Sequence, residues 1–395
     1  MSSYTVRKLK IGKTEQLDRL ARAAGELYSR TVVSFWRTVR HKDIWIKASS
    51  MMRWHNSEEL HAHSADAVVQ NFYASLQSWR ARRKSDPNAK PPRRRRWFYK
   101  VTWKSSAIRL KNGKLMLSNG KGNESLVIDW NWEKPKIIEM GWNGTQYELR
   151  ACYPAEVETE NNQGNVAGVD LGEIHLAVTH DGINTDIFNG RYLRSVRRYQ
   201  NKLKAKLSSL IDKKQRGSKS RKRLVKSKQK QLTKLKNQIK DILHKTTSLI
   251  VSTLKSRGVQ TLVIGDVRDI RANLDYGKKA NQKLHQWVFG EVRHMLTYKA
   301  VRQGMKVELI NEAYTSQTCP SCGKRHKPKN RNYRCRHCGF EFHRDGVGSI
   351  NIRKKYLGDS TPVVGLMASP VGVRFHPHLQ RSLQLLNGAA RIPCL

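Results

Sequence analysis

Two Cys-x-x-Cys pairs near the C-terminal end constrain this sequence more than any other feature. The pairs are separated by twelve residues, and a glycine follows each of them, at positions 323 and 339. The four cysteines are Cys319, Cys322, Cys335 and Cys338. Four thiolates at this spacing can surround Zn²⁺ tetrahedrally, and a glycine suits the tight turn that follows each pair. The sequence therefore predicts a structural Zn²⁺ site.

The charge of the chain indicates a polyanionic partner. Lysine and arginine number 76 against 31 acidic residues, which gives 395 residues a formal charge of +45. Such a charge repels itself unless a polyanion neutralises it, and nucleic acid is the expected partner. A membrane surface is the alternative, but we find no apolar run near 18 residues and expect no signal peptide. Outside the zinc set only Cys152 and Cys394 remain, so we expect a reducing, cytoplasmic and nucleoid-associated location.

The N-terminal part is expected to combine a small β structure with a helical insertion. Residues 4–10 alternate in the manner of an edge strand, whereas residues 14–84 show a helical period. Residues 97–157 alternate again, as short strands with Asn-Gly turns. We expect the first strand to join these later strands in a β-barrel or sheet.

A basic and aromatic run lies at the junction between the helices and the later strands. Its members are Arg93, Arg94, Arg95, Arg96, Trp97 and Tyr99. A solvated face or a localisation tag is the alternative interpretation of an arginine run. Aromatic neighbours favour a nucleic-acid contact, because arginines bind phosphates while rings stack on bases.

From residue 166 the pattern changes to alternating strands and helices. Three strands are followed by helices, a strand at 260–266, a helix from about Gln282 to Gln303, a strand at 306–310 and a final helix. This α/β succession is that of the ribonuclease-H-like fold. Residues 191–245 carry 21 Lys and Arg against two Asp, which predicts a basic helical hairpin that can lie along a duplex. Its apolar seam is expected at Leu203, Leu207, Leu210, Leu232, Leu235, Ile239 and Ile242.

Carboxylates occur where the predicted strands end and the last helix begins. Asp170 lies among apolar residues, where a carboxylate is costly to bury without a cation. A turn aspartate bonded to the backbone is the alternative interpretation. Asp345 opens the final helix, seven residues after Cys338. Hard cations such as Mg²⁺ prefer carboxylate oxygens, and paired ions can stabilise the attacking and leaving oxygens of a nuclease reaction.

Four segments together resemble the TnpB family, transposon-encoded nucleases related to miniature type V CRISPR effectors. The segments are Gly168-Val-Asp-Leu-Gly, Phe289-Gly-Glu-Val-Arg-His-Met-Leu-Thr-Tyr-Lys-Ala, Tyr314-Thr-Ser-Gln-Thr-Cys-Pro-Ser-Cys-Gly and His343-Arg-Asp-Gly-Val-Gly-Ser-Ile-Asn-Ile. The resemblance is specific from residue 166 to 356, and residues 1–160 match only in layout. It implies an RNA-guided DNA endonuclease that binds a guide RNA and double-stranded target DNA and recognises a short flanking motif. It also implies Mg²⁺ or Mn²⁺ at the nuclease site, and a monomer is favoured.

The resemblance also implies a domain layout for an α/β protein. A β-barrel wedge domain (1–13 and 86–160) is interrupted by a helical recognition domain (14–85). An RNase H-like (RuvC) nuclease domain spans 161–315 and 342–358, contains the basic hairpin 191–258 and surrounds a zinc ribbon at 316–341. Residues 359–395 form a tail that the sequence leaves unassigned.

The middle carboxylate of the expected nuclease site departs from the family pattern. By position Asp170 matches the first catalytic carboxylate and Asp345 the last, but the fourth strand ends with Gly265 and Asp266 in place of Glu and Asp. Glu312, which follows the fifth strand, is the preferred substitute, and Asp266 is the second choice. Glu291 is a third candidate, although a helical glutamate beside cations is more often a surface residue.

Two other functions stay open at this point. The first is an RNA-guided DNA-binding repressor that has lost cleavage, which Gly265 keeps under consideration. The second is a DNA-joining transposase with an acidic triad. That function shares the predicted sheet but does not explain the zinc insertion before the last carboxylate.

Overall fold

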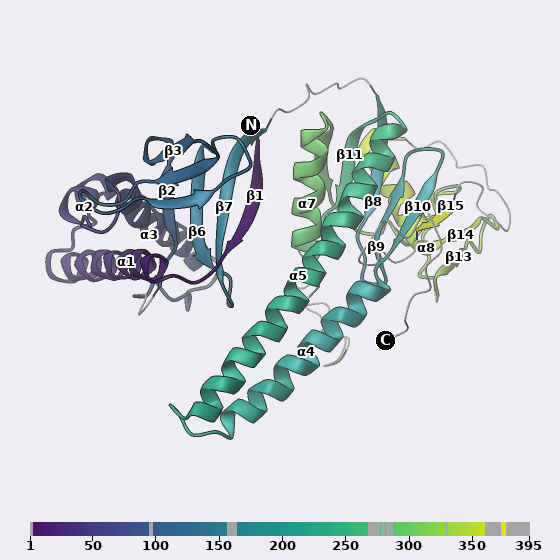
Figure 1. Cartoon of the computed structure of the whole chain (residues 1–395). Helices are drawn as coiled ribbons and strands as arrows, with labels where there is room; N and C mark the ends of the chain where they lie inside the picture. The colour runs from purple at the N-terminus through teal and green to yellow at the C-terminus, as the bar shows by residue number, and fades with distance from the viewer. Residues whose placement is uncertain are drawn as a thin grey trace, which may run out of the picture. The chain divides into compact units, whose positions relative to one another are not determined.

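The chain divides into two compact units, Met1–Ala155 and Glu156–Leu395, in the computed structural model of the protein (Figure 1). The structure describes residues 3–94, 98–155, 164–267, 277, 281, 287–328, 330–359 and 373–376. Among these residues, no helix has both the length and the apolar character needed to cross a membrane.

The first unit combines three helices with short antiparallel strands. Its helices are α1 (Glu15–Lys42), α2 (Ala48–Trp54) and α3 (Ala62–Arg83). Its strands are β1 (Ser3–Ile11), β2 (Val101–Lys104), β3 (Ile108–Lys111), β4 (Lys114–Leu117), β5 (Leu126–Asp129), β6 (Ile137–Trp142) and β7 (Tyr147–Ala155). A short 3₁₀ turn, Ser105–Ala107, separates β2 from β3. The helix α1 begins at an N-cap, Thr14, whose side chain accepts a hydrogen bond from the Leu17 amide.

The strands of the first unit form two sheets. One has the order β1-β7-β6-β2 and the other the order β3-β4-β5. As the alternation of residues 4–10 predicts, β1 is an edge strand, and it pairs with β7 so that Leu9 lies opposite Leu149. Because the described strands are divided between two sheets, closure into one barrel stays a prediction.

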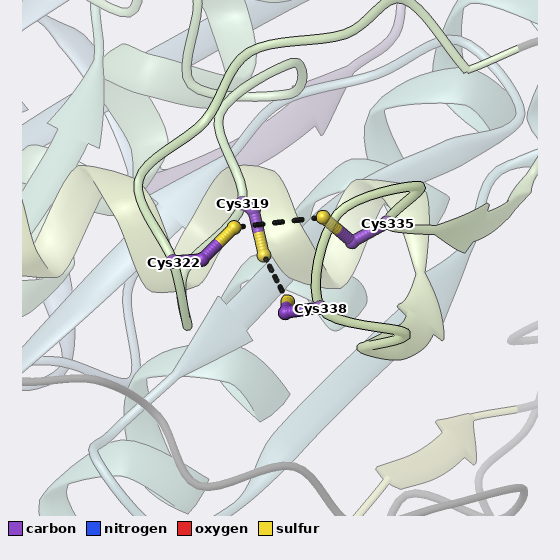
Figure 2. A group of neighbouring side chains, drawn as sticks. All are labelled: Cys319, Cys322, Cys335 and Cys338. Carbon is purple, nitrogen blue, oxygen red and sulfur yellow. Dashed lines mark hydrogen bonds between the residues drawn. The ribbon is translucent and has the colours of Figure 1, made fainter.

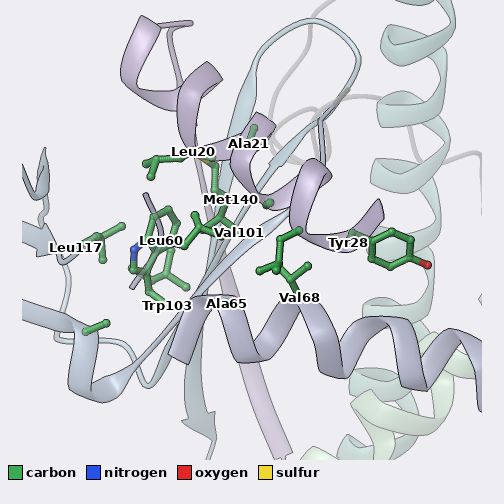
Figure 3. Close-up of a cluster of buried hydrophobic side chains, with 14 of the residues drawn as sticks. Leu20, Ala21, Tyr28, Leu60, Ala65, Val68, Val101, Trp103, Leu117 and Met140 are labelled. Atoms are coloured by element: carbon green, nitrogen blue, oxygen red, sulfur yellow. The ribbon is translucent and has the colours of Figure 1, made fainter. Parts of the chain in front are cut away.

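A single apolar core joins the helices and strands of the first unit (Figure 3). Trp103 of β2 and Met140 of β6 are fully buried, and they lie beside Leu20 of α1 and Val68 of α3. The Trp103 indole donates a hydrogen bond to the Ser118 carbonyl, so its one polar group is satisfied. The helical segment 15–83 therefore packs on the sheet as part of the same core.

The second unit is an α/β structure around a six-stranded mixed sheet. The sheet order is β12-β11-β8-β9-β10-β15, and β11 is parallel to both β8 and β12. The strands are β8 (Asn165–Asp170), β9 (His175–His180), β10 (Thr185–Asn189), β11 (Val259–Gly265), β12 (Lys306–Ile310) and β15 (Val373–His376), with a small hairpin of β13 (Asn332–Arg334) and β14 (Glu341–His343). The helices are α4 (Arg191–Asp212), α5 (Lys219–Ser256), α7 (Phe289–Arg302) and α8 (Arg344–Leu357).

Helices cover both faces of this sheet. On β8, Ala167 and Val169 belong to the core that includes α5 and α7. Successive strand residues face opposite sides, so Gly168 and Asp170 face the other side, where α8 packs against β8. This alternation turns the Asp170 carboxylate toward the helix that carries Asp345.

The basic hairpin is present as α4 and α5, which run side by side in Figure 1. Its seam differs from the predicted one at one position. Leu207 and Ile211 are buried, whereas Leu210 is 39% exposed. The helical period explains the difference. Ile211 follows Leu207 by four residues and lies on the same buried face, whereas Leu210 follows it by three and is turned toward solvent.

Two further elements differ from the prediction. The helix expected from about residue 282 is described from Phe289, and positions 282–286 lie outside the described residues. Within the unassigned tail, β15 pairs in parallel with β10 and completes one edge of the sheet. The imidazole of His376 in β15 donates a hydrogen bond to the fully buried carboxylate of Asp186. The Arg257 guanidinium donates to the same carboxylate. A buried ion network therefore fastens this strand to the sheet.

Candidate metal centres

Three parallel strands place carboxylates at one edge of the second unit's sheet. Asp170 is the last residue of β8, Asp266 follows β11, and Glu312 lies two residues after β12. Parallel strands end at the same edge, so these three side chains start close together. Asp345, in the first turn of α8, joins them from the covering helix.

A close approach between α8 and β8 depends on Gly348. A Cβ atom at this position would lie 2.5 Å from Oδ2 of Asp170, well inside van der Waals contact. Because Gly348 has no side chain, the Asp170 carboxylate can occupy the space beside it. Any larger residue at position 348 would displace this carboxylate or the helix.

The electrostatics of Asp170 show that the cluster is crowded with negative charge. Burial raises the pKa of Asp170 well above its usual value, and the charges of Glu312 and Asp345 raise it further. Arg344 and Arg331 offset part of this increase. A divalent cation would remove the remaining repulsion, because carboxylate oxygens are ligands that Mg²⁺ and Mn²⁺ prefer. Among the described residues, however, Asp170 and Glu312 do not belong to the groups whose ligand atoms lie within 4.8 Å of one another.

Glu312 occupies the space beside Gly265. A Cβ atom on Gly265 would lie 2.6 Å from Glu312 Oε2 and 3.3 Å from its Cβ. That carboxylate oxygen is buried and, among the described residues, has no hydrogen-bond partner. Burial first, and then the charge of Asp266, raise the pKa of Glu312 to about 7. A buried acceptor without a donor is a feature that a metal ion would explain.

The two other candidates for the middle carboxylate have cationic neighbours. Asp266 lies 3.5 Å from Arg293 of α7, which compensates its charge. Glu291 is exposed at the start of α7, and its charge acts on Arg197 of α4. Asp266 therefore interacts with the cluster through its effect on the pKa of Glu312. Glu291 instead interacts with Arg197 of the basic hairpin.

Hydrogen-bond donors hold the Asp345 carboxylate in place. His175 Nδ1 lies 2.8 Å from Asp345 Oδ2, and the Arg331 guanidinium donates to the same oxygen. Burial raises the pKa of Asp345, but these donors outweigh it and lower the pKa to about 2. Asp345 is thus ionised while its neighbours resist ionisation. His343, the N-cap of α8, brings a second imidazole within 4.8 Å of His175 and Asp345.

Sequence reasoning missed His175 and Arg331 as members of this site. His175 opens β9, and the sequence did not predict the register in which β9 pairs with β8. Arg331 is one of several cations in the loop between the cysteine pairs. No local spacing distinguishes either residue from its neighbours. Only the positions of β9 and of the β13–β14 hairpin against α8 bring them to Asp345.

The four cysteines converge as their spacing predicts (Figure 2). Sγ of Cys319 lies 3.6 Å from Sγ of Cys338, and the Cys322–Cys335 distance is also 3.6 Å. Thiolates at about 2.3 Å from a tetrahedral zinc would be about 3.8 Å apart, so the geometry fits Zn²⁺. The glycines that follow the pairs, 323 and 339, have φ of +71° and +73°, which suits the turn that each must make.

The cysteine cluster is attached to the helix that carries Asp345. The Asn351 side chain donates to the carbonyls of Thr315 and Thr318, at 2.7 Å each, and Lys354 donates to the carbonyl of Pro320 at 2.6 Å. Arg331, from the loop between the cysteine pairs, reaches Asp345 itself. These hydrogen bonds connect the cysteine cluster directly to α8 and to the Asp345 carboxylate.

We expect the change Cys319→Ser to remove most of the zinc that copurifies with the chain. Three thiolates bind the ion less completely than four, and Cys319 is almost fully buried at the centre of the cluster. Metal analysis of the purified protein measures the zinc content. Cys152→Ser is the matched control, because Cys152 lies in β7 of the other unit. Unchanged zinc in the Cys319 variant would contradict a four-thiolate site.

The predicted nucleic-acid residues are only partly described. Arg93 and Arg94 line a groove of about 860 Å³ in the first unit, together with Trp36 and Arg40 of α1. The ring of Tyr99 lies 4.5 Å from that of Tyr28. Tyr99 therefore packs against the core. Three predicted residues, Arg95, Arg96 and Trp97, lie outside the described part of the chain.

Two family models match this chain. Residues 150–271 match the model described as probable transposase, and residues 289–352 match the Cas12f1-like TNB domain. The second match includes the four cysteines, Glu312 and Asp345.

Curated relatives and a solved structure extend these matches. A TnpB-like protein of Methanocaldococcus jannaschii is 32% identical over 122 residues, which are 30% of this chain and 44% of that protein. The CRISPR-associated endodeoxyribonuclease Cas12f2 of a Micrarchaeota archaeon is 27% identical over 241 residues, 56% of this chain and 42% of that protein. A Cas12f1–sgRNA–target DNA complex aligns with a TM-score of 0.58 and 13% identity, over 86% of this chain and 81% of that chain.

The structural match defines the class, a mixed α/β fold like that of the miniature Cas12f effectors with a zinc-ribbon-like cysteine cluster. Within that class, the chain is similar in sequence to TnpB-like proteins and to Cas12f endodeoxyribonucleases, as its four sequence segments predict. The matched region spans less than half of the length of the first two relatives.

Proposed function

We propose that the chain is an RNA-guided DNA endonuclease that cleaves by divalent-metal-dependent phosphodiester hydrolysis. The observation that carries the proposal is the position of Asp170 and Glu312 at the ends of neighbouring parallel strands, below the helix that carries Asp345. Burial and the charges of Glu312 and Asp345 raise the pKa of Asp170, and burial and the charge of Asp266 raise that of Glu312. Such crowding destabilises a protein unless it serves a ligand, and a divalent cation is the ligand that carboxylate oxygens favour.

We assign Asp170, Glu312 and Asp345 to the binding of Mg²⁺ or Mn²⁺. When bound, the metal would polarise the scissile phosphate and stabilise the attacking and leaving oxygens. His175 and Arg331 fix the orientation of Asp345 through hydrogen bonds. Arg331 and Arg344, beside the carboxylates, also attract the phosphate of the strand to be cut. Zn²⁺ on the four thiolates has a structural role in this scheme.

The partners proposed are a guide RNA and double-stranded target DNA. The formal charge of +45 supports a long polyanion, and the α4–α5 hairpin offers a basic surface for the phosphate backbone. We assign the wedge domain to residues 1–13 and 86–160, the helical recognition domain to 14–85, the RuvC-like domain to 161–315 and 342–358, and the zinc ribbon to 316–341. In this division of labour, base pairing reads the target while the protein reads a short flanking motif.

The direct test is cleavage of a plasmid library by the chain purified with its coexpressed RNA. We expect linear products in Mg²⁺, with cut sites beside one short flanking motif. Chelation of Mg²⁺ should stop cleavage while the RNA stays bound, since the basic surfaces do not depend on that ion. Cleavage that persists in chelator would contradict the proposed chemistry.

A cleavage-deficient RNA-guided repressor is the second candidate, and Gly265 is the observation that favours it. A strand that ends in glycine lacks the carboxylate expected there. Target binding without any Mg²⁺-dependent cutting in the same plasmid assay would support the repressor.

A further inference from the structure

Tyr314 has a backbone conformation that its own packing does not explain. Its φ is +66°, in the left-handed region that bulky side chains rarely adopt. Among the described residues, the other non-glycine residues with positive φ are Asp43 and Asn112, types that tolerate it. The Tyr314 side chain is nevertheless 55% exposed, so burial of the ring does not offset the strain.

In the chain, the strained turn lies between Glu312 and the first cysteine pair. Thr315 donates its amide to the Glu312 carbonyl at 3.1 Å, and its hydroxyl to the same oxygen at 2.8 Å. Thr318, next to Cys319, donates its amide to the Tyr314 carbonyl at 3.0 Å. These bonds hold the ring two residues from Glu312 and five from the first zinc-ribbon cysteine.

A cation supports the exposed ring. The Arg325 guanidinium carbon lies 4.4 Å from the centroid of the Tyr314 ring, within cation–π distance. Arg325 is itself exposed and pairs with Thr318 across the turn of the first cysteine pair. Ring and guanidinium therefore form a pre-assembled, solvent-facing pair, and the ring follows Glu312 by two residues in the chain.

We propose that Tyr314, supported by Arg325, is a stacking platform for a base of the DNA strand that enters the carboxylate cluster. The inference rests on the proposed function, because it takes a nucleic-acid strand as the occupant. A π face accepts any base, which suits an enzyme whose sequence recognition is delegated to RNA. Arg325 adds a positive charge for the adjoining phosphate. Strain persists where it serves a site, and here it accompanies a ring that is exposed to solvent two residues after Glu312.

Photocrosslinking tests the contact without any cleavage. The full chain with its coexpressed RNA is mixed in buffer without Mg²⁺, and without chelator so that zinc is retained, with single-stranded DNA that contains iodouracil. The sample is irradiated, digested and analysed by mass spectrometry. We expect a crosslink on the peptide that carries Tyr314, kept in Tyr314→Phe and lost in Tyr314→Gly. Crosslinks at other aromatic residues with none at Tyr314 in the unmodified chain would overturn the proposal.

Stability and affinity together separate a platform from a packing residue. Glycine adopts the left-handed conformation freely, so Tyr314→Gly should leave the melting temperature unchanged or raise it. The same variant should bind the strand about 5- to 150-fold more weakly, the range for loss of one base stack. A marked fall in melting temperature would show that the ring holds the fold, and would overturn the proposal. If the unmodified chain crosslinks at Tyr314 but never cuts DNA, the endonuclease function fails while the platform stands.

Discussion

Replacing Asp170 by asparagine is expected to reduce Mg²⁺-dependent cleavage by about a thousandfold or more while guide RNA and target binding persist. Asparagine keeps the shape of the side chain but loses the charge that binds the ion. The carboxylate lies against Gly348, and the neighbouring carboxylates of Glu312 and Asp345 are assigned to the same ion, so neither is available to take its place. Cleavage and filter-binding assays on the same preparation measure both effects.

The same variant has an expected effect on stability with the opposite sign. Without metal, the pKa of Asp170 is raised well above its usual value, so the fold disfavours the ionised form. A raised carboxyl pKa costs stability as pH increases through it, and asparagine removes that cost. Metal-free Asp170→Asn should therefore melt at a higher temperature near neutral pH, and Mg²⁺ should no longer shift its melting temperature.

Asp241→Asn is the matched control for the Asp170 change. Asp241 belongs to α5 and pairs with Lys245 one turn later, away from the carboxylates. It should cut at the normal rate and keep its response to Mg²⁺. A loss of folding in Asp170→Asn, measured by the same melting curves, would make Asp170 a structural residue and contradict the assignment.

Exchanging the residues at positions 265 and 312 is expected to show which carboxylate completes the site. Glu312→Gly should abolish cleavage because it removes the ligand. Gly265→Glu should do the same, because a Cβ at that position would lie 2.6 Å from Glu312 Oε2. The double variant Gly265→Glu/Glu312→Gly should recover much of the activity, since the loss of the Glu312 side chain frees the space that a carboxylate at position 265 needs.

A double-mutant cycle of cleavage rates measures this coupling. Asp266→Asn is the comparison, and a reduction much smaller than that of Glu312→Gly is expected because Arg293 already compensates its charge. Abolished cutting in Asp266→Asn, together with normal cutting in Glu312→Gly, would assign the third position to the strand-end aspartate. A double variant as inactive as each single one would contradict the shared-space argument.

Local sequence determined the cysteine cluster and the order of the second unit's elements. The two cysteine pairs can meet because the spacing and the glycines that follow them fix two tight turns. Strand and helix periods likewise placed β8 with Asp170 and α8 with Asp345, because each period is set by neighbouring residues. The predicted seam was wrong at Leu210, because Ile211, four residues after Leu207, lies on the buried face in its place.

Contacts between distant segments were decided by tertiary structure alone. Glu312 fills the space beside Gly265 only because β12 pairs with β11 in a register that places Ile310 opposite Gly265. His175 and Arg331 reach Asp345 from positions 170 and 14 residues away in the chain. The tail strand β15 completes the sheet because Asp186, which also pairs with Arg257, offers a buried acceptor for His376. Short sequence patterns specify turns and periods, whereas burial, register and long-range pairing are properties of the packed chain, and those properties assembled the site.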